Sequence, residues 1–64
     1  MDPMNDYFIV RFIRADRGPD EEYYYPREQA AIDHYNLFLD DDSGLYSRIE
    51  IEYNNQILKI LDPG

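Results

Sequence analysis

The chain lacks cysteine and tryptophan, and its 64 residues include a single lysine and a single histidine. Without thiols it forms no disulfide bond, and one imidazole is too little for a structural zinc site. No apolar run approaches the roughly 20 residues that a membrane helix needs, and the N-terminus lacks the pattern of a signal peptide. We therefore expect a cytoplasmic protein with no metal, no other cofactor and no membrane contact.

The small size of the chain limits it to a single domain, residues 1–64, with loose tails at 1–6 and 62–64. A chain of this length buries only about 60% of the surface that its unfolded form exposes. Hydrophobic residues make up 44% of the chain, which is too many for a disordered protein. Stability must then come from good packing, self-association or a partner.

The charge of the chain is one-sided, with 14 acidic residues against 6 basic ones and a net charge of −8. Such a protein is repelled by phosphate backbones and anionic lipids, which disfavours direct binding to nucleic acid or membranes. Basic proteins are the favoured partners. Of the aromatic residues, 7 are tyrosine and 3 phenylalanine. Tyrosine suits half-exposed surfaces, so it indicates either an interface or the rim of a thin core.

The first half of the chain predicts a β-hairpin. Residues 7–14 are rich in β-branched and aromatic side chains, with Phe8, Val10 and Phe12 on one face. Residues 15–20 contain turn-forming Asp, Gly and Pro. Residues 21–25 have strand propensity in their three tyrosines, although an extended loop is the alternative.

A helix is predicted over residues 26–39. Pro26 suits the first helical turn, and Gly44 lies in the segment that ends the helix. One apolar stripe recurs at helical spacing and consists of Ala31, Ile32, Tyr35, Phe38 and Leu39.

The C-terminal third predicts a second hairpin. Residues 45–53 alternate between apolar and polar, Asn54-Asn55 suits a two-residue type I′ turn, and residues 56–61 form the return strand. This turn pairs Tyr53 with Gln56, and an unbroken register then pairs Ile51 with Leu58, Ile49 with Ile60 and Glu50 with Lys59. The sequence therefore predicts a small α+β domain of order β-β-α-β-β, with one helix on one face of an antiparallel sheet.

Two acidic clusters are predicted to meet at one end of this fold. The second strand climbs about 16 Å and the helix descends about 20 Å, so the chain returns to its starting height. Aspartates beyond a helix C-terminus oppose the helix dipole, which favours a functional role, although solvated loops remain the simpler reading. We name this set the acidic pole: Asp16, Asp20, Glu21, Glu22, Asp40, Asp41 and Asp42.

The sheet face away from the helix is a second candidate surface. Its predicted members combine apolar, aromatic and arginine side chains, a composition typical of interfaces. The residues singled out for partner binding are Tyr7, Arg11, Tyr24, Tyr46 and Arg48, with Ile9, Ile13, Ile57 and Leu61 beside them.

Catalytic and metal-binding constellations are poorly represented. His34 has Asp33, Ser43 and Ser47 available, but so small a fold offers little volume for a cleft that excludes water. The spacing around Gly44 does not match a calcium loop, in which glycine is sixth and glutamate twelfth. We predict no enzymatic activity, no catalytic residues and no metal site.

The segment from Tyr25 to Ile51 resembles short acidic proteins of bacterial mobile elements and phages. The resemblance is carried by residues 34–38, HYNLF, and 41–46, DDSGLY. In size and charge alone the chain also resembles anti-CRISPR inhibitors. This resemblance implies a stoichiometric inhibitor whose acidic surface engages the basic groove of a nuclease or other nucleic-acid-binding protein. The alternative is a structural homodimer or accessory subunit that associates through the outer sheet face.

Overall fold

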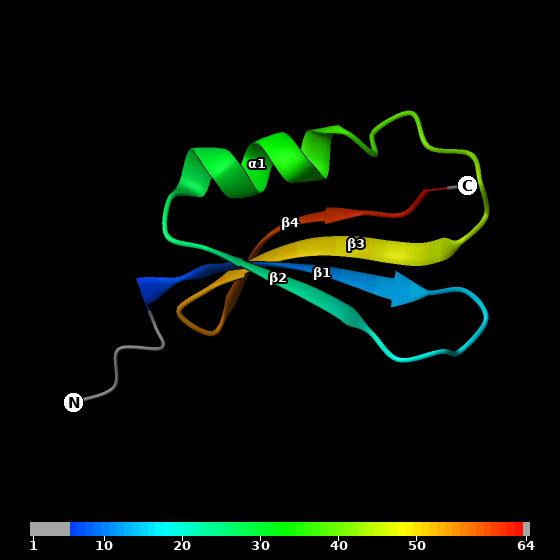
Figure 1. The fold of residues 1–64 in the computed structure, drawn as a ribbon, viewed down its shortest axis with the longest axis horizontal. Coiled ribbons are helices and arrows are strands. Elements are labelled where there is room, and N and C mark those ends of the chain that lie inside the picture. Colours follow the sequence, from blue (N-terminus) through cyan, green and yellow to red (C-terminus); the bar gives the residue numbers. More distant parts are fainter. Residues whose placement is uncertain (1–5, 64) are drawn as a thin grey trace.

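The protein is a four-stranded antiparallel sheet covered on one face by a single helix (Figure 1). The structure, a computed structural model, describes residues 6–63. Its elements are β1 (Phe8–Arg14), β2 (Glu21–Tyr25), α1 (Glu28–Asn36), β3 (Tyr46–Tyr53) and β4 (Gln56–Leu61). The predicted α+β class and β-β-α-β-β order are confirmed. Of the predicted tails, residues 1–5 and 64 lie outside the described part.

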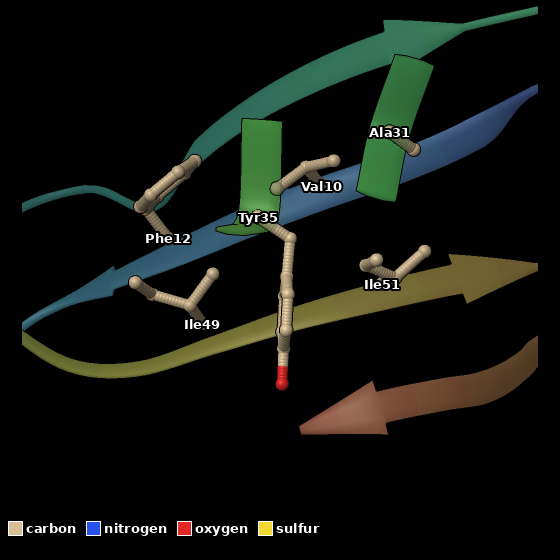
Figure 2. Close-up of a cluster of buried hydrophobic side chains, with 6 residues drawn as sticks. All are labelled: Val10, Phe12, Ala31, Tyr35, Ile49 and Ile51. Carbon is tan, nitrogen blue, oxygen red and sulfur yellow. The ribbon is translucent and has the colours of Figure 1, made fainter. Parts of the chain in front are cut away.

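The strands lie in the order β2-β1-β3-β4, which places β1 and β3 at the centre of the sheet. Both central strands carry β-branched and aromatic residues that the helix covers. Figure 2 shows the resulting core between α1 and these strands. Its buried side chains are Val10, Phe12, Ala31, Tyr35, Ile49 and Ile51.

The helix is shorter than predicted. Pro26 precedes it, Arg27 is its N-cap residue, and the α-helical segment ends at Asn36. Tight turns continue to Asp41, whose N–H donates to the carbonyl of Phe38 at 3.1 Å. The apolar stripe therefore ends early: Leu39, predicted to face the core, is exposed. No helix within residues 6–63 is long and apolar enough to cross a membrane.

The predicted turn of the second hairpin is confirmed, but most of its register is wrong. Asn54 and Asn55 both have positive φ, 55° and 66°, as a type I′ turn requires. Tyr53 pairs with Gln56, and Glu52 pairs with Ile57. A bulge then shifts the register, so that the partners of β3 are Ile49↔Leu61, Glu50↔Ile60 and Ile51↔Lys59.

The register shift has a physical reason. An unbroken ladder would place Leu58 and Ile60 on the helix face and leave Leu61 on the outer face. With the extra residue at Leu58, Leu61 lies opposite core residue Ile49 and packs against the core. Leu61 is thus on the helix face, and its predicted position on the outer face is wrong.

Tyr46 was also assigned to the wrong face. The pairing of β1 with β3 shifts between Ile13 and Arg14, so that Ile13 opposes Arg48 whereas Arg14 opposes Tyr46. The shift leaves Ser47 as the extra residue and turns Tyr46 toward the helix. Its ring lies 5.0 Å from that of Phe12 and 5.9 Å from that of Phe38, measured between centroids.

Candidate functional site

The two acidic segments lie at the same end of the molecule. Figure 1 shows the β1–β2 turn and the loop between α1 and β3 on the right-hand side, near the C-terminus. A backbone hydrogen bond joins them, since the N–H of Ala15 donates to the carbonyl of Leu45 at 2.9 Å. The two segments that carry the acidic pole therefore lie at the same end of the sheet.

Part of the acidic pole is neutralised by arginine. Arg14 Nη2 lies 2.8 Å from Asp16 Oδ2, and Arg14 Nη1 lies 3.2 Å from Glu21 Oε2. The hydrogen bonds from Arg14, and one from the N–H of Gly18, hold the pKa of the Asp16 carboxyl well below its usual range. Glu21 also accepts hydrogen bonds from the hydroxyls of Tyr23 and Tyr46, at 3.3 and 3.2 Å.

The rest of the acidic pole is different. Asp20, Asp40, Asp41 and Asp42 form no ion pair with any residue between 6 and 63. We call these four residues the unpaired aspartates. Asp41 accepts a hydrogen bond from Ser43 Oγ at 2.8 Å, which orders the loop without changing its charge.

Glu22 does not belong with the unpaired aspartates, because its side chain lies on the outer sheet face. There it accepts a hydrogen bond from Arg11 Nε at 2.7 Å. That bond, with a second from Tyr24, lowers the pKa of the Glu22 carboxyl. Glu22 is therefore ion-paired, unlike the four unpaired aspartates.

Arg11 is the centre of a charge cluster on the outer face. Its Nη1 donates to both Glu50 Oε1 and Glu52 Oε1, each at 2.8 Å. Burial of the guanidinium opposes its charge, but the hydrogen bonds to the three glutamates raise the pKa of Arg11 overall. One cation thus holds three carboxylates, including that of Glu50, whose side chain is only 9% exposed.

The remaining predicted members of the outer face surround this cluster. Tyr7 and Tyr24 are exposed and their rings meet edge to face at 6.4 Å. Arg48 lies 3.7 Å from Asp62 and 4.0 Å from Glu50. The outer face is therefore charged at its centre, where Arg11 is surrounded by three carboxylates. Face-to-face packing of two copies would bring two net-negative clusters together, which disfavours such a homodimer.

The only histidine of the chain lies among aromatic rings under the helix. His34 is 5.1 Å from Phe12 and 4.9 Å from Tyr23, between ring centroids, and its Nδ1 is 2.8 Å from the hydroxyl of Tyr25. Burial lowers the pKa of His34. This setting depends on Tyr23 and Tyr25 of β2, a strand that the helical pattern around His34 does not reveal.

The lowered pKa of His34 gives the stability of the fold a pH dependence. The folded state favours neutral imidazole. The contribution of His34 to the free energy of unfolding is therefore complete above the unfolded pKa of about 6.5, and it is lost as pH falls through the lower pKa of the folded state. Urea unfolding at about pH 7.5 and about pH 5.5 should show lower stability in acid, and His34→Gln should flatten the difference. An unchanged pH dependence in His34→Gln would assign the effect to other groups.

Neither a pocket nor a cluster of metal-ligating side chains provides a further candidate site within residues 6–63. The structure of residues 6–63 contains no detectable pocket, and no group of three metal-ligating side chains is gathered within that range. Comparison with protein-family models, curated proteins and solved structures gave no significant match.

Proposed function

We propose that the protein is a non-enzymatic binding module whose acidic pole engages a basic surface of another protein. The observation that carries the proposal is the gathering of the unpaired aspartates at one end of the fold. Three of them, Asp40, Asp41 and Asp42, are consecutive. Their mutual repulsion is not relieved by any ion pair with residues 6–63.

The position of these aspartates relative to α1 supports a role other than stability. The C-terminal end of a helix carries partial negative charge and favours nearby cations. Asp40, Asp41 and Asp42 follow that end after only a few residues in tight turns. A partner that supplies Lys or Arg side chains would relieve both the repulsion and the unfavourable dipole interaction.

Exposed leucines in the same segment favour a protein partner. Leu37, Leu39 and Leu45 flank the consecutive aspartates, and Leu37 is 78% exposed. Protein interfaces combine apolar contacts with complementary charge. An acidic surface that merely kept the protein in solution would not require exposed leucines. The partner surface should therefore be basic with apolar residues among its charges.

A basic groove on a nucleic-acid-handling protein, such as a nuclease, fits this description. The protein would then act as a stoichiometric inhibitor of the anti-defence type, in the bacterial or host cytoplasm. Mimicry of a whole duplex is not required. DNA as long as the fold, whose longest extent is 39 Å, carries about 23 charges. The chain has a net charge of only −8, so a local contact is the better fit.

The test is affinity capture from a bacterial lysate, followed by titration of the captured partner with purified protein. In Asp40→Asn/Asp41→Asn/Asp42→Asn, we expect the dissociation constant to rise by about 100-fold at low salt, because three interfacial charges are lost. We also expect the affinity of the unchanged protein to fall steeply with added salt.

A matched control removes three acidic charges elsewhere: Asp6→Asn/Glu28→Gln/Asp33→Asn. These side chains are exposed and lie outside the acidic pole. The control should bind within a few-fold of the unchanged protein. Equal affinity in the triple Asp→Asn variant would rule out the acidic pole, and equal losses in both variants would reduce the effect to net charge.

A further inference from the structure

The sheet has two edges, formed by β2 and β4, and no residue between 6 and 63 pairs with the free side of either strand. A free edge presents unpaired backbone N–H and C=O groups to which another strand can bind. Proteins usually protect such edges, so the two strands can be compared for the protection that each one carries.

The β4 edge is protected against pairing with its own copy in the two registers centred on Leu58 and Lys59. A two-fold axis between antiparallel strands passes through a residue that then faces itself. An axis at Lys59 places two ammonium groups opposite each other. An axis at Leu58 places Ile57 opposite Lys59, although the bulge has turned these residues to opposite faces.

The β2 edge carries no such protection. Its pairing with β1 is unbroken over all five residues, Glu21 to Tyr25. A two-fold axis at Tyr23 pairs Glu22 with Tyr24 of a second copy and Glu21 with Tyr25 of that copy. Each pair shares a face, and no like charges oppose each other. An axis at Glu22 would place carboxylates opposite each other, and one at Tyr24 would use Pro26, which has no N–H.

The high net charge of the chain does not block this edge. Glu22 and Glu21 are each ion-paired with an arginine of their own copy, since Arg11 lies 2.7 Å from Glu22 and Arg14 lies 3.2 Å from Glu21. The hydroxyl of Tyr24 already donates to Glu22 of its own strand at 3.0 Å, so tyrosine and carboxylate are compatible neighbours on this surface. The unpaired aspartates lie in the turn and loop beyond the edge residues.

We propose that the protein forms a two-fold dimer in which β2 pairs antiparallel with β2 of a second copy, centred on Tyr23. The two sheets then form one continuous sheet, and both helices lie on the same face of it. Because the paired strands run in opposite directions, the two acidic poles lie at opposite ends of the dimer. The dimer stands independently of the proposed binding function and would make that binding bivalent.

Disulfide trapping tests the register directly, because the chain has no cysteine of its own. Residues opposite each other in an antiparallel pair have Cα atoms about 4.5–5.5 Å apart, within the range that a disulfide spans. Under mild oxidation, Tyr23→Cys should yield a covalent dimer at least about tenfold faster than Lys59→Cys on the other edge. Equal rates would overturn the proposal.

A second test avoids Tyr23, whose ring contacts Phe12 and His34. Tyr24→Glu places a carboxylate opposite Glu22 of the second copy, and Gln56→Glu makes the same charge change on β4. Sedimentation from about 10 µM to about 1 mM should show a dimer whose dissociation constant rises at least about tenfold in Tyr24→Glu only. A monomer throughout, or equal shifts in both variants, would contradict the proposal.

Discussion

Replacing Arg11 with methionine should destabilise the fold by about 3 kcal/mol or more, because the change leaves three carboxylates without their shared cation. Glu22, Glu50 and Glu52 each lie within 2.8 Å of the guanidinium. Glu50 is nearly buried, so its charge cannot be solvated in place. Urea unfolding monitored by circular dichroism gives the change in the free energy of unfolding.

Arg48 provides the matched control for Arg11. Its side chain is 49% exposed, compared with 20% for Arg11, and its nearest carboxylate oxygens are 3.7 and 4.0 Å away. Arg48→Met should therefore cost at most about 1 kcal/mol. Adding Glu50→Gln to Arg11→Met should recover part of the loss. If Arg11→Met costs no more than Arg48→Met, the outer-face cluster does not stabilise the fold.

Phe12→Ala should reduce the free energy of unfolding by about 3–5 kcal/mol. Phe12 is 1% exposed, and its ring contacts Tyr23, Phe38 and Tyr46 at centroid distances of 5.6, 4.8 and 5.0 Å. A domain of this length has a total stability of about 3–10 kcal/mol, so the variant should be largely unfolded at moderate temperature.

Phe12→Leu keeps most of the side-chain volume and is the control for Phe12→Ala. It should cost about 1–2 kcal/mol and leave the far-ultraviolet circular dichroism spectrum unchanged. If Phe12→Ala keeps a melting temperature near that of the unchanged protein, Phe12 is not at the centre of the core.

The fold class follows from local patterns in the sequence. Alternation in residues 48–53, helical spacing from Ala31 to Phe38 and the Asn54-Asn55 turn each depend on neighbouring residues, and each agrees with the structure. The acidic loops lie at one end because element lengths alone fix where the chain returns. Periodicity and length are properties that a single sequence contains in full.

The sequence-based register of the second hairpin is wrong because it continued unbroken from the Asn54-Asn55 turn, supported by aliphatic pairs and by one charge pair. Opposing Glu50 to Lys59 looks favourable while only these two strands are considered. In the structure, Glu50 is bound by Arg11 from β1, a strand distant in sequence, so Lys59 is not needed. Long-range partners of this kind depend on the strand order β2-β1-β3-β4, which the sequence alone does not define.

The two bulges account for the side chains that were assigned to the wrong face. Strict alternation places Tyr46 with Arg48, but the extra residue at Ser47 reverses the faces on one side of it. The sequence of β4 does contain a sign of its bulge. Two pairs of neighbouring aliphatic residues do not fit the apolar–polar alternation of a strand with one buried face. For Tyr46 the cause is tertiary: its ring fits beside Phe12, and its hydroxyl reaches Glu21.

The acidic pole as the binding surface is tested most directly by mapping backbone amide shifts of isotopically labelled protein during titration with the captured partner. We expect the largest shifts in residues 15–20 and 37–45, where the unpaired aspartates and exposed leucines lie. Residues of the outer face, such as Arg11, Glu50 and Ile60, should change little. Shifts concentrated on that face, with residues 37–45 unaffected, would contradict the proposed function.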